Sequence, residues 1–174
     1  MKPTLTLCKP ALTVFVSVLA AGATALAADV SGSDKSFIQD EYKDGLAEVK
    51  LAELAQGKTA NAEVKTFATQ MATDHGKANA ELKALAASKN VEVASEPSVI
   101  AKGRIKMLDA KSGAEFDKDW VESMIKEHKD AVKDFEKAAN EANDADVKAF
   151  AAKTLPTLKH HLSMAEGLLS KVKK

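Results

Sequence analysis

Three histidines, His75, His128 and His161, are the residues of this 174-residue chain whose type and spacing best suit chemistry. Each one replaces an apolar residue in the hydrophobic stripe of a different predicted helix, so all three are expected to face the core. A neutral imidazole donates a nitrogen lone pair to first-row divalent ions such as zinc, copper, nickel or iron. The pattern therefore predicts a site for one divalent transition metal ion.

Other side chains could complete this site. Glu48 borders the inward face of the first predicted helix, and its carboxylate would partly neutralise a bound ion. Asp74 and Glu127 precede two of the histidines and point about 100° away, which suits a supporting role or a surface ion pair. Met71 and Met124 lie one turn before the same two histidines, where a thioether could bind Cu(I) or simply fill the core.

Hydrophobic periodicity indicates an all-α protein, a four-helix bundle of ferritin-like connectivity. Asp34 has the short acceptor side chain of a helix cap, and Pro156 is expected to kink the last helix. A long connection with a short helix of its own separates the second and third long helices, and so must span the length of the bundle. The expected helices cover residues 33–57, 61–88, 98–108 (the short one), 114–140 and 147–172.

Helical geometry can test whether the four candidate ligands share one level. With a rise of about 1.5 Å per residue, Glu48 and the three histidines fall within about one helical turn of each other in an antiparallel bundle. This result permits a common site. The alternative is that each histidine is an ordinary core residue whose nitrogens find hydrogen-bond partners.

The first 28 residues have the pattern of a secretory signal peptide, with Lys2 and Lys9 ahead of an uncharged run over residues 11–28. Cleavage is expected after Ala27 or nearby, which leaves residues 29–174 as one domain with no membrane-spanning segment. Cys8 precedes the apolar run and would be removed, so no disulfide is expected. We therefore expect a periplasmic or outer-membrane-associated protein.

The distribution of charged residues and the absence of known catalytic motifs argue against several classes of function. The 25 basic and 25 acidic residues alternate along the chain, which gives no electrostatic footprint for nucleic acid. No nucleophile with its base, phosphate loop or dinucleotide fingerprint is present, so no catalytic residue is assigned and an enzyme is the third choice. An envelope protein or a second copy of the chain remains a possible partner.

Four stretches together resemble a known family: LAEVKLAELA, VKTFATQMATDHGKAN, FDKDWVESMIKEHKDAV and FAAKTLPTLKHHLSMA. They are similar to the bacterial envelope family of unknown function number 4142, often labelled predicted outer membrane protein. The resemblance implies a ferritin-like helical domain and no established activity. The chain departs from di-iron bundles, which place a Glu three residues before His, whereas Ala72, Ile125 and Leu158 stand there.

Two functions follow from these observations. The first is an exported bundle that binds one ion through His75, His128, His161 and Glu48, for storage, sensing or stress tolerance. The alternative is a non-catalytic envelope bundle whose histidines bind nothing and whose surface binds a partner.

Overall fold

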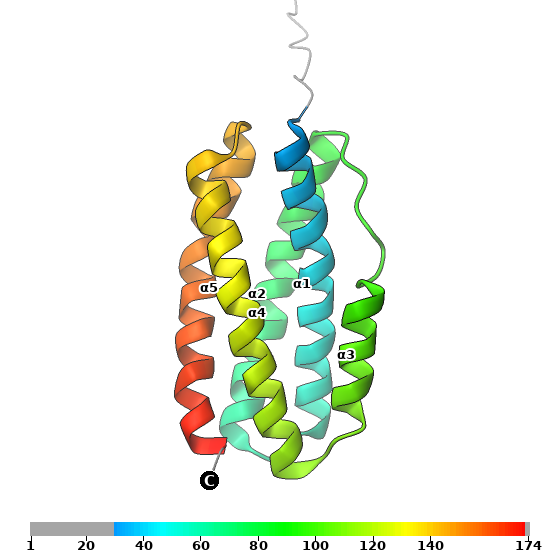
Figure 1. Ribbon diagram of the computed structural model, residues 1–174, viewed down its shortest axis with the longest axis vertical. Coiled ribbons are helices and arrows are strands. Elements are labelled where there is room, and N and C mark those ends of the chain that lie inside the picture. The colour runs from blue at the N-terminus through cyan, green and yellow to red at the C-terminus, as the bar shows by residue number, and fades with distance from the viewer. Residues whose placement is uncertain (1–29, 173–174) are drawn as a thin grey trace, which may run out of the picture.

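A computed structural model describes residues 30–172, which form helices joined by short turns and one long connection, with no strand in that part of the chain. The predicted signal peptide lies outside the described residues. Figure 1 shows the long helices side by side, with a short helix against the outside of the bundle. The helices are α1 (Gly32–Lys58), α2 (Ala62–Ser88), α3 (Val99–Asp109), α4 (Gly113–Glu141) and α5 (Ala145–Val172).

Short polar side chains set the starts of three helices, because they accept hydrogen bonds from amides that have no intrahelical partner. Ser31 caps α1, Asn61 caps α2 and Ser98 caps α3. The cap of α1 differs from the expected one. Asp34 lies inside the helix, and its carboxylate instead accepts the backbone N–H groups of Asn143 and Asp144 in the α4–α5 turn. α5 continues through Pro156.

The core consists of two apolar clusters at different heights in the bundle. The lower cluster contains Phe67, Met71, Trp120 and Met124, and the upper one is built around residues such as Phe135. Burying this apolar surface is the main force that holds the helices together. The indole of Trp120 also donates to the backbone oxygen of Leu51, at 2.9 Å, so its buried N–H is satisfied.

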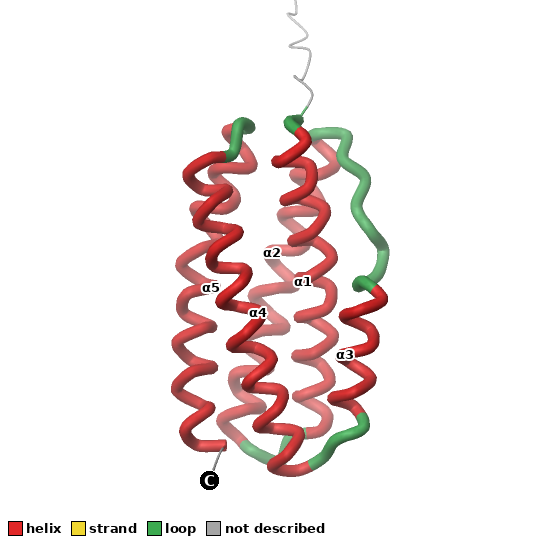
Figure 2. The backbone as a smooth tube through the Cα atoms, viewed as in Figure 1, coloured by secondary structure: helices red, strands yellow, loops and turns green. Residues whose placement is uncertain are grey.

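The connectivity is that of two helical hairpins joined by a crossover. α1 packs closely on α2, and α4 packs closely on α5. Figure 2 shows the connection descending from the end of α2 into α3, which runs beside α1 before the chain enters α4 at the opposite end. The expected ferritin-like bundle with a crossover helix is therefore confirmed. Among the described helices, none is long and apolar enough to span a membrane.

Candidate metal centre

The three histidines meet in one layer between the two apolar clusters. Their ring centroids form a nearly equilateral triangle: 5.4 Å from His75 to His128, 5.2 Å from His75 to His161, and 5.5 Å from His128 to His161. One nitrogen from each ring lies within 4.8 Å of the other two. The rings of His128 and His161 are 0% exposed, and His75 is 6% exposed. The sequence-based expectation that these three residues converge is therefore confirmed.

One nitrogen of each imidazole is held by an acceptor outside the triangle. Nδ1 of His75 donates to Oε2 of Glu48 at 2.8 Å, and Nε2 of His161 donates to Oδ2 of Asp74 at 2.9 Å. Nδ1 of His128 donates to the backbone oxygen of Met124, also at 2.9 Å. Such bonds keep the proton on the bonded nitrogen and leave a lone pair on the other.

The other nitrogen of each ring is buried and has no hydrogen-bond partner. These atoms are Nε2 of His75, Nε2 of His128 and Nδ1 of His161. Leaving a buried polar atom unpaired costs about 1–3 kcal/mol, so three in one layer require a reason. Three lone pairs from rings around a common centre are what a divalent metal ion would use.

The charges in this layer depend on Glu48. Burial alone would raise the pKa of its carboxyl group, but the neighbouring imidazoles, that of His75 foremost, outweigh burial and lower the pKa to about 2. Burial likewise opposes a charge on His75, yet Glu48 raises the pKa of this imidazole above its usual value. Burial lowers the pKa of His128, and it lowers the pKa of His161 to about 4. These pKa shifts favour the neutral, lone-pair-bearing forms of His128 and His161, whereas Glu48 favours a second proton on His75, which an arriving metal ion would have to displace.

The remaining candidates lie in different surroundings. Glu48 faces the histidines, with Oε1 at 3.8 Å from Nδ1 of His128. Asp74, named as a supporting residue, is the carboxylate that contacts His161. Glu127 points away from the triangle toward α3, where it pairs with Arg104. Met71 and Met124 are fully buried in the lower apolar cluster.

A small cavity of about 30 Å³ adjoins the histidine layer on its upper side. His75 and His161 form part of its wall, together with the carboxylates of Glu48 and Asp74. Apolar side chains close most of the rest, and the polar groups of Glu41, Asn79, Thr154 and Thr157 also line it. Of these polar lining residues, sequence reasoning identified only the histidines, Glu48 and Asp74.

A second cavity, of about 210 Å³, lies between α1, α3 and α4. Half of its lining residues are acidic, Glu48 among them, and Arg104 and Lys126 add two basic side chains. This cavity could not be predicted from the sequence, because its acids come from two long helices and have the spacing of ordinary surface residues. The acidic residues are Glu41, Asp44, Glu48, Glu127, Asp130 and Asp134.

The fold and the buried triangle together define a class: a four-helix bundle with a three-histidine centre in its core. The chain belongs to the family described as Domain of unknown function (DUF4142), whose model matches residues 19–168. This finding confirms the resemblance seen in the sequence. No functionally curated protein matches the chain.

Two solved structures share the fold at low sequence identity. A fragment of a DUF305 protein from Deinococcus radiodurans has a TM-score of 0.74 at 14% identity, covering 83% of this chain and 99% of its own. A DUF305 protein from Streptomyces coelicolor has a TM-score of 0.69 at 15% identity, covering 81% of this chain and 94% of its own. At this level of identity the likeness supports the fold alone.

Proposed function

We propose that this protein binds one divalent transition metal ion through His75, His128 and His161. One observation carries the proposal: each of the three rings has one nitrogen held by an outer acceptor, while the other is buried and unpartnered. An ordinary core histidine would satisfy both nitrogens. A ligating histidine uses one nitrogen for the ion and the other for an orienting acceptor.

Glu48 and Asp74 act in this proposal as orienting groups. Their carboxylates contact nitrogens that already carry a proton, so they fix the ring orientation and make the opposite nitrogen a stronger donor. Both also offset the charge of the ion, which matters because two positive charges in a dry interior are costly. The proposal thus moves Glu48 from the ligand set expected from the sequence to the surrounding shell.

The donor set restricts the metal to ions that favour imidazole. Zinc, copper, nickel and iron do so, whereas magnesium and calcium prefer oxygen ligands. For metal–nitrogen bonds of about 2.0 Å, tetrahedral ligand nitrogens would lie roughly 3.3 Å apart. One nitrogen of each ring now lies within 4.8 Å of the others, so the three rings would have to move closer together around an ion. Storage, sensing or stress tolerance are the roles that fit such a site.

We further propose that the protein is exported and works in the periplasm or at the outer membrane. The support is the uncharged run over residues 11–28 behind two lysines. Cell fractionation, with N-terminal sequencing of the recovered protein, tests this proposal. A mature chain that begins near residue 28 supports export, and a full-length chain in the cytoplasm contradicts it.

The metal proposal is tested by titrating the purified, chelator-treated protein with Zn²⁺, Cu²⁺, Ni²⁺ and Co²⁺ and measuring bound metal per chain. We expect one ion per chain, and stabilisation by about 2.7 kcal/mol when free metal is about 100 times the dissociation constant. Replacing His75, His128 or His161 singly by Gln should weaken binding at least about 100-fold, because each substitution removes a ligand.

His160 provides the matched control, since it is exposed and directly precedes His161. The variant His160→Gln should bind metal as the unaltered protein does. Circular dichroism of each metal-free variant shows whether it folds. Equal metal binding by His128→Gln and His160→Gln, or no stoichiometric binding of any of the four ions, would end the proposal.

A second candidate function is supported by the outer surface of α3. Val99, Ile100 and Met107 are large apolar side chains of this one short helix, and they are 85%, 79% and 70% exposed. Exposed apolar surface of this kind can mark a site for a partner. This surface favours the alternative of an interaction bundle that binds an envelope partner. Such a role does not require the histidine nitrogens to be unpartnered, so the metal-binding proposal accounts for more of the structure.

A further inference from the structure

We propose that the bound ion keeps one coordination position for a small exchangeable ligand, a water molecule that a small monodentate anion can replace, in the cavity above the histidine layer. This inference rests on the proposed metal-binding function. It adds a statement about which molecules can reach the ion. Structural metal sites are enclosed by four protein ligands, whereas sites that exchange a ligand have three and an open position.

The protein supplies three ligand nitrogens and places the nearest carboxylates elsewhere. Oε2 of Glu48 and Oδ2 of Asp74 are already hydrogen-bonded to the outer nitrogens of His75 and His161. Moving either carboxylate onto the ion would break the bond that orients a ligand. The fourth ligand is therefore expected to come from the space beside the triangle, above or below it along the bundle axis.

Below the triangle the interior is tightly packed. Phe67, Met71 and Met124 are each no more than 1% exposed there. The ring of Phe67 lies edge-on to His161 with a centroid distance of 6.1 Å. An exchangeable ligand has no room on this side. The sulfur of Met71 or Met124 is the protein group that would compete for the fourth coordination position.

Above the triangle lies the small cavity, and the direction of each helix shows that it is on one side only. Apart from Asp74 beside the triangle, its further lining residues precede Glu48 on α1, follow His75 on α2 and precede His161 on α5. Because the helices alternate in direction, all of these positions lie toward the end that carries the α4–α5 turn (Figure 1). The cavity is thus the layer directly above the ligand nitrogens.

The size and lining of the cavity select a small polar ligand. Its volume of about 30 Å³ holds one or two water molecules, since one water requires about 10–15 Å³. The amide of Asn79 and the hydroxyls of Thr154 and Thr157 line it and can hydrogen-bond such a ligand. Gly45 makes room for Asn79, because a Cβ at residue 45 would lie 2.1 Å from Oδ1 of that amide. An organic substrate would not fit.

The test uses the full chain loaded with Co²⁺, whose visible absorption changes with its ligands. Sodium azide is titrated into the loaded protein. We expect a saturable one-site spectral change, because azide replaces the water. The variant Ala78→Leu extends a side chain that lines the cavity, and should bind Co²⁺ within about threefold of the unaltered protein while its azide affinity falls at least about tenfold.

The variant Ala80→Leu is the matched control: it makes the same change on the exposed face of α2 and should respond to azide like the unaltered protein. A second measurement needs no variant. The water-proton relaxation rate of the Cu²⁺-loaded protein should rise above that of the metal-free protein, and azide should reverse the rise.

Three results would overturn the inference. The first is a Co²⁺ spectrum that azide leaves unchanged, and the second is a Cu²⁺-loaded protein without enhanced water relaxation. The third is a Co²⁺ spectrum that is changed by the substitution Met71→Leu or Met124→Leu but not by azide. The last result would identify a thioether as the fourth ligand. Failure to bind Co²⁺ at all is observed before azide is added, and it contradicts the metal-binding function itself.

Discussion

At the scale of single residues, the proposed site depends on which ring nitrogen each neighbour holds. Three acceptors of different kinds, two carboxylates and one backbone oxygen, each take one nitrogen of a different histidine. The sequence could place the histidines on inward faces, because helical periodicity determines the direction of each side chain. It could not show that Asp74 reaches His161, since that contact crosses from α2 to α5 and depends on how the two helices pack.

The variant Asp74→Asn tests this orienting role. The substitution removes the negative charge that holds the proton on Nε2 of His161, so we expect metal affinity to fall about 10- to 100-fold with one ion still bound per chain. Isothermal titration with Zn²⁺ measures the change. Glu81→Gln, an equal change of charge on the same helix but away from the histidines, should leave affinity within about twofold. Equal affinities for the two variants would show that Asp74 plays no part.

At the scale of helices, both hairpins are held in register by contacts that the helix patterns do not reveal. Asp34 was expected to cap the first helix, because short acidic residues do so often. In the structure Ser31 performs that role, and the buried carboxylate of Asp34 accepts two N–H groups from the α4–α5 turn, more than one hundred residues later in the chain. The preference of aspartate for helix starts was correctly recognised, but in the folded protein Asp34 contacts the distant α4–α5 turn instead of capping its own helix.

The variant Asp34→Asn should destabilise the protein by about 1–2 kcal/mol, since it replaces charge-assisted hydrogen bonds with weaker ones at a buried position. Urea unfolding followed by circular dichroism measures the loss. Asp40→Asn changes an exposed acid on the same helix and should cost less than about 0.5 kcal/mol. If both variants unfold at the same urea concentration, the link between α1 and the turn contributes nothing to stability.

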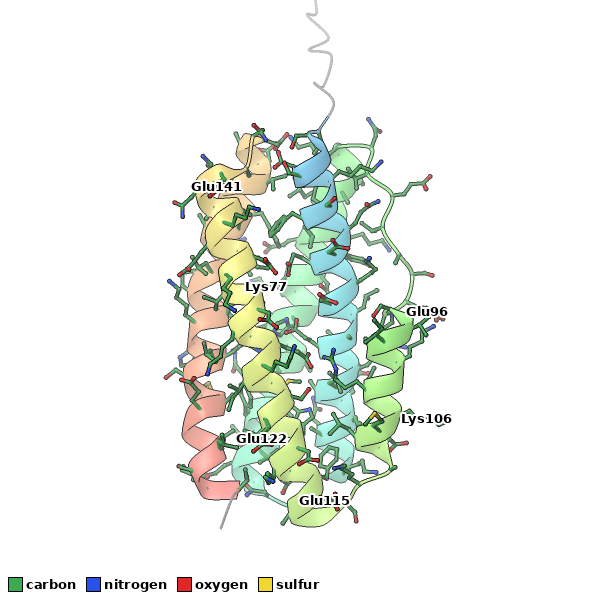
Figure 3. The ribbon with its side chains drawn as sticks, in the orientation of Figure 1. Lys77, Glu96, Lys106, Glu115, Glu122 and Glu141 are labelled. Atoms are coloured by element: carbon green, nitrogen blue, oxygen red, sulfur yellow. The ribbon has the colours of Figure 1, made fainter. Side chains whose placement is uncertain are left out.

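At the scale of the whole molecule, charge is distributed unevenly between the surface and one interior region. Figure 3 shows labelled charged side chains such as Lys106, Glu115 and Glu141 on the outside, where charges are well solvated. The larger cavity instead gathers acids of α1 and α4 beside α3, of which Glu41, Glu48 and Glu127 are not exposed. Burial first, and then the charges of Glu48 and nearby aspartates, raise the pKa of Glu41 to about 9. The sequence could not predict this, because the largest cause is burial, which depends on how the helices pack around Glu41.

The raised pKa gives a pH dependence with a definite sign. Glu41 holds its proton in the folded protein up to about pH 9 but loses it near pH 4.5 when unfolded, so its contribution to stability falls as pH rises between these values. Glu41→Gln, which mimics the protonated form, should remove that decline and be more stable at pH 8 by about 2 kcal/mol.

Urea unfolding of the metal-free protein at pH 5, 6.5 and 8 measures the effect of Glu41→Gln. Glu53→Gln, an exposed acid on the same helix, serves as the control and should follow the unaltered protein at each pH. A difference between the two variants that does not grow with pH would show that Glu41 is ionised in the folded state.

The proposed ligands come from both helical hairpins, and this has a consequence for the rate of unfolding. His75 belongs to α2 in the first hairpin, whereas His128 and His161 belong to α4 and α5 in the second. An ion bound to all three would fasten the hairpins together, in a chain whose single cysteine rules out an internal disulfide. Pulling the hairpins apart would then require breaking metal–nitrogen bonds. Loading should therefore slow unfolding much more than it speeds folding, and the loaded protein should outlast the metal-free form against proteases.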